Sequence, residues 1–408
     1  MQCKDNFNYI IAGAGAAGLS LLRHLMQSEL KDRRILLADM SFDPANNKTW
    51  CFWEETPLMM DIISHRWSGL EILSDGKSLA GPFTGDYFCI RSEHYRRKIL
   101  DEARKMDCIT FLETGITGFS ADESRGYMHS ENGIYSAEWV FQSVMQSANR
   151  PPSTRESSED SPDEFSEGPS GESSVIQHFK GWEISANADL FNPDRATLMD
   201  FDSGYSKGLA FYYVLPFSSR NALIEYTVFS DYVCGEDTYD TAIQNYLDDR
   251  FNLRDGDYTV LRRELGEIAM EDRKMPGYYN GRTINIGTVG GLAKPSTGYA
   301  FTRIQRHSRQ IVDALTCNKP PEPYSGSGYR FRVYDTMLLY LLRNDIENSR
   351  KIFRILFTKN RIDRIFRFLG ERTNFLQELI IFSKMPWVPF LKSIFKMRRR
   401  ILGLVKTD

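Results

Sequence analysis

A glycine-rich turn near the start of the chain has the residue types and spacing of a phosphate-binding loop. Gly13, Gly15 and Gly18 form a G-x-G-x-x-G between a predicted strand, Asn8 to Ala12, and a predicted helix, Leu19 to Ser28. Gly13 permits a tight turn, Gly15 lets a pyrophosphate approach the backbone, and Gly18 allows the helix to pack closely. The free N–H groups at the start of the helix would then bind the phosphates.

Asp39 supports a dinucleotide as the ligand of this turn. It follows the next predicted strand, Arg34 to Ala38, about 20 residues beyond the glycines, where a carboxylate accepts a hydrogen bond from an adenosine ribose. Strand, glycine turn, helix and strand in this order predict the opening of a doubly wound α/β sheet. A glycine turn with a purely structural role is the alternative.

A second group of small residues lies late in the chain, between a predicted strand, Thr283 to Gly287, and a predicted helix, Phe301 to Leu315. Its glycines and proline are Gly287, Gly290, Gly291, Pro295 and Gly298. FAD is long enough to need one platform for its adenosine end and another for its flavin end, so the two loops together predict FAD. A loop of small residues without a ligand is the alternative.

A single carboxylate interrupts an apolar predicted strand, Ala222 to Phe229. Strand periodicity places Leu223, Glu225 and Thr227 on one face. If that face is buried, desolvation raises the pKa of Glu225, which suits a general acid. If the strand is half exposed, Glu225 is an ordinary solvent-facing side chain.

Three aromatic residues and a carboxylate follow the second strand in the segment TWCFWE, namely Trp50, Phe52, Trp53 and Glu54. Because ring faces attract positive charge, these residues would suit the wall of a site for a flat, apolar or cationic species. Packing in an ordinary core is the alternative.

Chain length and composition indicate how these motifs are organised. A chain of 408 residues with 41% hydrophobic and 26% charged residues predicts a soluble protein of two closely packed domains. We expect a Rossmann-type FAD-binding domain at residues 1–143 and 281–316, with interleaved elements of the substrate domain, and a mainly antiparallel β-sheet substrate domain at 175–280. Residues 147–174 are almost entirely Ser, Pro, Glu, Asp and Gly, and predict a disordered acidic insert or a phosphorylated interaction segment.

Charge is concentrated at the end of the chain. Residues 330–408 hold 18 Lys and Arg against 7 Asp and Glu, a charge of +11, so the preceding residues carry −14 of the total of −3. The net charge of −3 argues against a general nucleic-acid binder, which would need a dominant basic surface. Residues 330–408 predict a basic helical segment that faces a membrane, because Arg350 to Leu369 has the pattern of an amphipathic interfacial helix. Packing of that helix on its own domain is the alternative.

The six cysteines have no metal-ligand spacing, so we expect no metal site and a reduced, cytoplasmic protein. The N-terminus has no long apolar run of a secretory signal, and no segment approaches the roughly 20 apolar residues of a spanning helix. Any membrane contact is therefore expected from one side.

These motifs resemble those of the flavoprotein lycopene cyclases, in particular the bacterial β-cyclases. The resemblance spans most of the chain, and TWCFWE and KPSTGYAF are its most specific segments. It adds Arg91, in YFCIR, to the expected cofactor-binding residues. Where many relatives have Gly-Asp beside the ribityl chain, this chain has Gly287 and Thr288.

The resemblance implies an intramolecular lyase or isomerase that cyclises the ψ-ends of lycopene to β-ionone rings, giving γ-carotene and then β-carotene. An acid protonates the terminal alkene, the neighbouring alkene closes the ring, and a proton is lost, with no net redox change. Glu225 matches the catalytic acid of the family, with Glu54 and Asp200 as the next candidates. Reduced FAD would stabilise the carbocation, and NAD(P)H would keep it reduced.

Lycopene dissolves only in membranes, so the resemblance also implies peripheral association with the inner face of the membrane through the basic C-terminal segment. Two alternatives use the same fold. One is a flavin-dependent monooxygenase or isoprenoid reductase, which would consume NAD(P)H as product forms. The other is a non-catalytic flavoprotein that docks on membranes.

Overall fold

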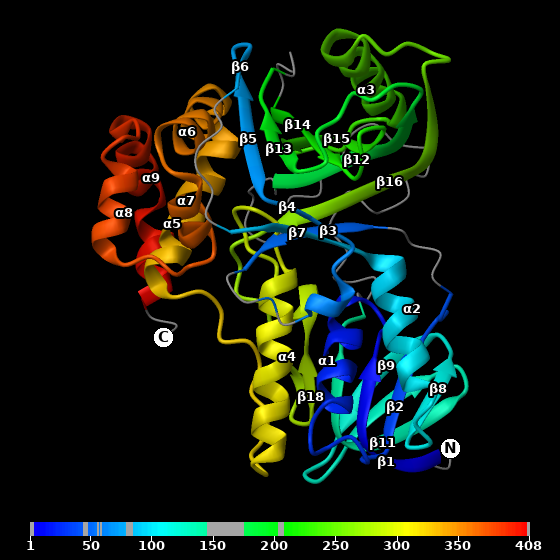
Figure 1. The fold of residues 1–408 in the computed structure, drawn as a ribbon. Helices are drawn as coiled ribbons and strands as arrows, with labels where there is room; N and C mark the ends of the chain where they lie inside the picture. Colours follow the sequence, from blue (N-terminus) through cyan, green and yellow to red (C-terminus); the bar gives the residue numbers. More distant parts are fainter. Residues whose placement is uncertain are drawn as a thin grey trace, which may run out of the picture.

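The computed structural model describes residues 4–43, 48–54, 57, 59–78, 85–144, 175–202 and 208–405. The expected acidic insert, residues 147–174, lies outside the described residues. Figure 1 shows two sheet-based halves, one above the other, and a group of helices beside the upper half.

The lower half contains an eight-stranded sheet in the order β17-β18-β11-β1-β2-β8, with β9 and β10 continuing from β11. Its strands are β1 (Lys4–Ala12), β2 (Ile35–Asp39), β8 (Ile109–Glu113), β9 (Ile116–Ala121), β10 (Gly126–Ser130), β11 (Gly133–Gln142), β17 (Tyr278–Asn280) and β18 (Thr283–Asn285). The five strands from β18 to β8 are parallel. The predicted strand–turn–helix–strand opening of a parallel α/β sheet is therefore confirmed.

Three helices cover one face of this sheet, α1 (Ala16–Met26), α2 (Ser92–Ala103) and α4 (Phe301–Thr316). The hairpin of β9 and β10 helps cover the other face. Since both faces are buried, β2 reads as a continuous apolar run rather than an alternating one. The late strand β18 enters the sheet beside β11, so residues about 270 positions beyond the first turn return to its neighbourhood.

The upper half contains a mainly antiparallel seven-stranded sheet in the order β16-β12-β15-β14-β13-β5-β6. Its strands are β5 (Gly69–Ser74), β6 (Lys77–Ser78), β12 (Val175–Ala186), β13 (Arg195–Asp200), β14 (Leu209–Pro216), β15 (Asn221–Ser230) and β16 (Tyr258–Met270). A three-stranded sheet of β3 (Thr49–Trp53), β7 (Tyr87–Arg91) and β4 (His65–Trp67) lies between the halves (Figure 1), and a short 3₁₀ turn spans Met60–Ile62.

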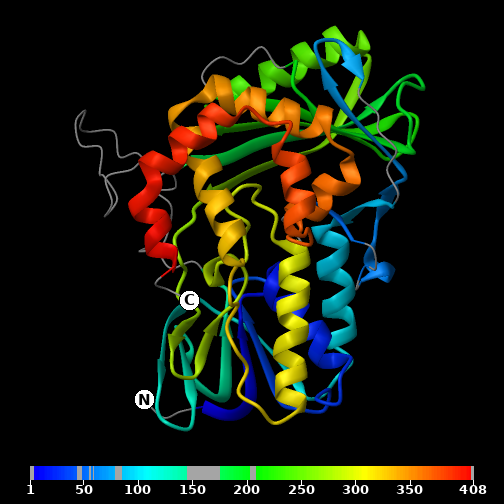
Figure 2. The ribbon, with the colours of Figure 1, turned by 90° about the vertical axis from the view of Figure 1, so that its left-hand side faces the viewer.

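Helices cover both faces of the upper sheet. On β15, Ile224, Tyr226 and Val228 pack toward α3 (Glu236–Phe251), whereas Leu223 and Phe229 belong to a second core shared with the C-terminal helices. Those helices are α5 (Tyr329–Asn344), α6 (Ile346–Lys359), α7 (Ile362–Leu369), α8 (Phe375–Phe382) and α9 (Trp387–Val405). Figure 2 shows them running along one side of the molecule. Among the described residues, no helix is both long and apolar enough to cross a membrane.

The expectation that Arg350 to Leu369 forms one membrane-lying helix is wrong. The segment forms two helices, α6 and α7, and its apolar side chains are buried in the second core: Ile352 is 2% exposed, Ile365 0% and Phe366 3%. An amphipathic pattern shows only that a face is covered, and here the upper sheet covers it. The uncovered apolar side chains lie further on, in α8 and α9.

Candidate active site

The first glycine turn has the backbone geometry that its sequence predicts. Gly13 has a φ of 101°, in the region that favours glycine, and a Cβ at Gly18 would lie 1.9 Å from the Gly13 carbonyl oxygen. A Cβ at Gly15 would meet no protein atom within 4 Å. The turn is therefore tightly packed at Gly13 and Gly18 and open at Gly15, the position expected to face a pyrophosphate.

Asp39 lies beside this turn. Its Oδ2 accepts a hydrogen bond from the Ala14 N–H at 2.5 Å, and its Oδ1 accepts from the Met40 N–H at 2.7 Å. Arg96, which the sequence analysis did not single out, donates from Nη1 to the Ala14 carbonyl at 2.8 Å. Asp39 thus binds the N–H of Ala14 and Arg96 binds its carbonyl group. These two hydrogen bonds stabilise the conformation of the turn.

The late glycine loop lies against the first one. A Cβ at Gly287 would lie 2.8 Å from the Cβ of Ala17 in α1, so only glycine permits this approach. The loop continues as a 3₁₀ turn, Gly287–Gly290, and Gly287, Gly291 and Gly298 have φ values of 66°, 78° and 70°. The two predicted platforms are therefore brought side by side.

A cleft of about 1930 Å³ begins at these two loops. Its lining includes Ala16, Gln142, Asn285, Thr288 and, from the predicted set, Gly290, Gly291, Pro295 and Gly298. The open position at Gly15 and a helix N-terminus without a side-chain cap fit a dinucleotide that runs from α1 into the cleft. The residues present thus fit FAD.

Arg91 does not line this cleft. Its guanidinium donates two hydrogen bonds, of 2.7 and 2.8 Å, to the carboxylate of Glu183 in β12, and it lies 4.6 Å from the ring centre of Phe217. These contacts hold the three-stranded sheet against the upper sheet.

Glu225 faces the far part of the same cleft, with Leu223, Tyr213 and Trp50. The Thr227 hydroxyl donates a hydrogen bond of 2.8 Å to Glu225 Oε1, so Leu223, Glu225 and Thr227 share a face, as the strand period predicts. Burial raises the pKa of the Glu225 carboxyl to about 8, the negative charge of Glu264 adds to the rise, and the Thr227 hydrogen bond opposes it. At neutral pH the side chain therefore carries a proton.

The four residues of TWCFWE do not line one cavity, and because successive residues of β3 face opposite sides, Trp53 points away from Trp50 and Phe52. Trp50 lines the cleft and stacks on Phe301 at 5.8 Å, whereas Phe52 is packed in the core. Trp53 lies in a different pocket, where it stacks on Phe366 at 4.3 Å. Of the four, only Trp50 shares a cavity with Glu225.

The two other candidate acids lie elsewhere. Glu54 is bound by Arg306, at 2.9 Å, and by Arg372. Asp200 accepts a hydrogen bond from Tyr246 at 2.8 Å and faces a separate pocket between β13 and α3. Among these three carboxyl groups, Glu225 alone faces the cleft that begins at the glycine loops.

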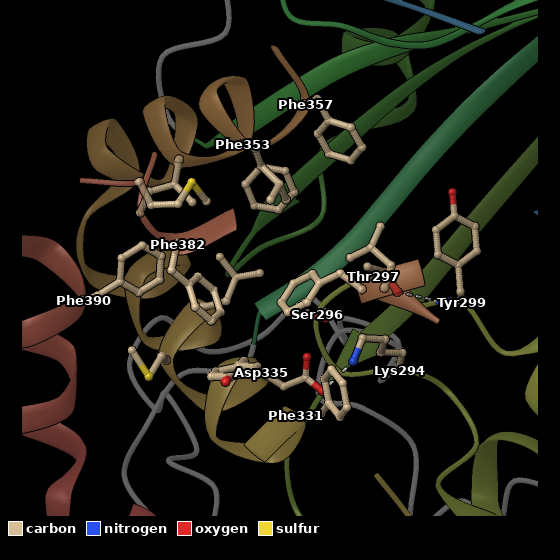
Figure 3. Close-up of a pocket in the computed structure, with 18 of the residues that line it drawn as sticks. Lys294, Ser296, Thr297, Tyr299, Phe331, Asp335, Phe353, Phe357, Phe382 and Phe390 are labelled. Carbon is tan, nitrogen blue, oxygen red and sulfur yellow. Dashed lines mark hydrogen bonds and ion pairs between the residues drawn. The ribbon is translucent and has the colours of Figure 1, made fainter. Parts of the chain in front are cut away.

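The pocket that contains Trp53 is apolar and has a volume of about 340 Å³. It lies between the upper sheet and α5 to α9, and nine phenylalanines contribute to its wall: Phe211, Phe229, Phe331, Phe353, Phe357, Phe366, Phe368, Phe382 and Phe390. In Figure 3 the labelled rings surround the space from several helices, with Lys294 and Asp335 at its polar end. The sequence analysis did not predict this pocket.

The pocket and the cleft share part of their walls, Gln177, Tyr213, Thr297, Tyr299 and Asp335. The hydroxyl of Tyr299 lies 3.1 Å from that of Tyr213 and 3.4 Å from that of Tyr87. Burial raises the pKa of all three tyrosines, so they remain neutral. An apolar chain in the pocket could therefore extend past these tyrosines toward Glu225.

Comparison with known proteins identifies the family. The family model described as lycopene cyclase protein matches residues 8–395. The chain belongs to the lycopene cyclase family. Within it, the chain is similar to a lycopene β-cyclase of Pantoea ananas, with 24% identity over 96% of this chain and 98% of that protein.

Solved structures agree with this family in fold. A geranylgeranyl bacteriochlorophyll reductase-like protein of Thermoplasma acidophilum has a TM-score of 0.57 and 10% identity, over 99% of both chains. A flavoprotein/dehydrogenase of Cytophaga hutchinsonii has a TM-score of 0.53 and 12% identity, over 92% of this chain and 98% of that one. The predicted Rossmann-type flavoprotein fold is thereby confirmed.

Among the described residues, no cluster of potential metal ligands is found.

We predict that Gly15→Val abolishes FAD binding, because the new side chain would enter the space expected for the pyrophosphate. The added Cβ meets no protein atom within 4 Å, so folding should be unaffected. Flavin absorbance of the purified protein measures occupancy. Gly118→Val, at a similarly open position in β9, is the control and should retain flavin; equal occupancy in both variants would show that the site is misplaced.

Proposed function

We propose that this protein is a lycopene β-cyclase, which closes the ψ-ends of lycopene to β-ionone rings by acid catalysis. The observation that carries the proposal is Glu225, a carboxyl group kept protonated by burial, in a cleft that joins a flavin-type platform to an apolar pocket. Family membership supports the same reaction.

Glu225 would supply the proton and recover it. Its carboxyl group protonates the terminal alkene, the next alkene attacks the resulting cation to close the six-membered ring, and loss of a proton from the ring leaves the new double bond. The Glu225 carboxylate left by the first step is a base and would accept this proton. One proton enters and one leaves, so the reaction needs no oxidant.

The walls of the cleft would stabilise the cation. Tyr213 stands directly opposite Glu225 in the β14–β15 pair, and Trp50 and Tyr299 also line the cleft. Aromatic faces attract a cation most strongly where water is excluded. Reduced FAD, kept reduced by NAD(P)H and held by the loops at Gly13–Gly18 and Gly287–Gly298, would add an electron-rich face to this environment.

The apolar pocket would hold the polyene next to its reacting end. Its wall of phenylalanines suits a hydrocarbon, and the ion pairs of Lys294 with Asp335, at 3.0 Å, and with Glu371, at 2.9 Å, join the flavin-side loop to the C-terminal helices. The pocket wall also includes Leu379, Trp387 and Leu391, which are 43%, 59% and 58% exposed on the outer surface. Substrate would enter here.

The surface around this entrance would bind an anionic membrane. Helices α8 and α9 expose Phe375, Leu376, Leu379, Ile380, Trp387, Val388, Leu391, Ile394 and Phe395, half of the exposed large apolar side chains among the described residues. Exposed Lys384, Lys392, Lys396 and Arg398 lie on or between the same helices. Apolar and basic side chains together are typical of an interfacial surface. The membrane-facing part of residues 330–408 would thus be α8 and α9.

We predict that Glu225→Gln binds FAD but forms no rings. The amide keeps the size of the side chain and has no acidic proton, so the rate should fall by about 10⁴-fold or more. Carotenoid products are measured anaerobically with the flavin reduced, since oxidised flavin would mimic the defect. Substantial ring formation by the variant would exclude Glu225 as the acid, and NAD(P)H consumed in proportion to product would favour a redox enzyme instead.

We predict that Val388→Glu combined with Phe395→Glu lowers binding to vesicles of anionic phospholipid and slows cyclisation of lycopene in those vesicles. Both side chains are more than 60% exposed and neither lines the apolar pocket, so activity in detergent micelles should be retained. Leu261→Glu is the control, because Leu261 lies on β16 and its side chain is also exposed, at 52%. Unchanged vesicle binding would exclude this surface as the docking site.

A further inference from the structure

Two glutamates approach each other across a glycine in the upper sheet. Strand β12 lies between β15 and β16, and its Gly181 is paired with Glu225 on one side and with Glu264 on the other. A Cβ at Gly181 would lie 3.5 Å from the Glu225 Cβ and 3.1 Å from the Glu264 Cγ. The missing side chain therefore leaves a space over β12 that the two glutamates share.

Glu264 is fixed firmly in this space. Its Oε2 accepts hydrogen bonds from Arg262 Nη1 at 2.8 Å and from the N–H and hydroxyl of Thr49 at 3.0 Å each. Only 2% of its side chain is exposed. Its other oxygen, Oε1, is buried, and no donor in the described part of the chain forms a hydrogen bond with it. One acceptor therefore remains for a proton carried by Glu225.

The anchoring extends through a row of alternating charges. Arg262 also donates from Nε to Glu183 at 2.6 Å, and Glu183 in turn binds Arg91. Each carboxylate in this row except Glu225 has an arginine partner. Glu264 therefore has an arginine partner in this buried site rather than standing as an isolated carboxylate beside Glu225.

We propose that Glu264 is a positioning residue for the acid, because its Oε1 accepts the hydrogen bond of protonated Glu225 and so holds the proton in place for the substrate. The inference rests on the proposed function and names a part of the site that the family resemblance did not supply. Gly181 is required for this contact, because a side chain at that position would separate the carboxyl groups of Glu225 and Glu264.

The like charge of Glu264 should also set the pH range of the enzyme. Among the described residues, the other titratable or charged groups that interact with Glu225 include Arg262 of β16, Cys51 of β3, Tyr213 of β14 and Tyr299 of the late loop. Of these, Arg262 lowers the pKa of Glu225, whereas burial and Glu264 raise it. Removing the charge of Glu264 should therefore let Glu225 ionise at lower pH.

The test is the pH profile of ring formation by Glu264→Gln, measured with FAD-loaded protein under reducing, anaerobic conditions. In the unaltered protein the rate should fall as pH rises through about 8. In Glu264→Gln this fall should move down by about one pH unit, because a carboxylate that shares a site with a second one has a raised pKa, while activity at low pH is retained. Glu236→Gln is the control, because Glu236 is an exposed carboxylate paired with Lys180. Its pH profile should match that of the unaltered protein.

Gly181→Ala provides a second variant that keeps both carboxylates and separates them. It should move the profile in the same direction, so the proposal remains testable if Glu264→Gln folds poorly. A uniform loss of rate at every pH in both variants, with the profile unmoved, would overturn the role of Glu264. That result would leave the proposed function intact, provided Glu225→Gln is inactive; ring formation by Glu225→Gln would overturn both.

Discussion

Partial burial of one carboxyl group is the constraint on which the rest of the structure depends. An exposed glutamate is ionised at neutral pH and could not protonate an alkene. Glu225 avoids this by standing on a strand whose face is covered by β3, the late glycine loop and the C-terminal helices. Its proton is retained because burial disfavours the charged form and the nearest carboxylate, Glu264, adds a like charge.

Each half of the molecule contributes something that the other cannot. The parallel sheet brings β18 beside β11 and β1, so that two glycine loops far apart in the chain form one platform. The antiparallel sheet supplies the acid and one wall of the apolar pocket, and the helices supply the other. Lys294 connects these parts, because it stands in the late loop and binds Asp335 of α5 and Glu371 beyond α7.

Local patterns in the sequence predicted the elements whose environment is set by neighbours in the chain. The strand–turn–helix–strand at the N-terminus, the helix Phe301 to Leu315 and the shared face of Leu223, Glu225 and Thr227 all follow from local period and turn chemistry, and the structure has them. Features that depend on distant pairing could not be predicted. The contact of Glu264 with Glu225 depends on the registers of β12 with β15 and β16, and the burial of α6 and α7 depends on which surface covers their apolar faces. The four residues of TWCFWE were assigned to one wall, although a strand period of two places Trp53 on the opposite side of β3 from Trp50 and Phe52.

The protonation state of Glu225 at neutral pH tests the account most directly. Infrared difference spectra of the FAD-loaded protein, titrated from about pH 5 to pH 10 and compared with those of Glu225→Gln, would isolate the band of its protonated carboxyl group. The account predicts a band that is present at pH 7, disappears with a midpoint near 8 and is absent from the variant. A band lost near pH 4.3, the ordinary value for an exposed glutamate, would contradict it.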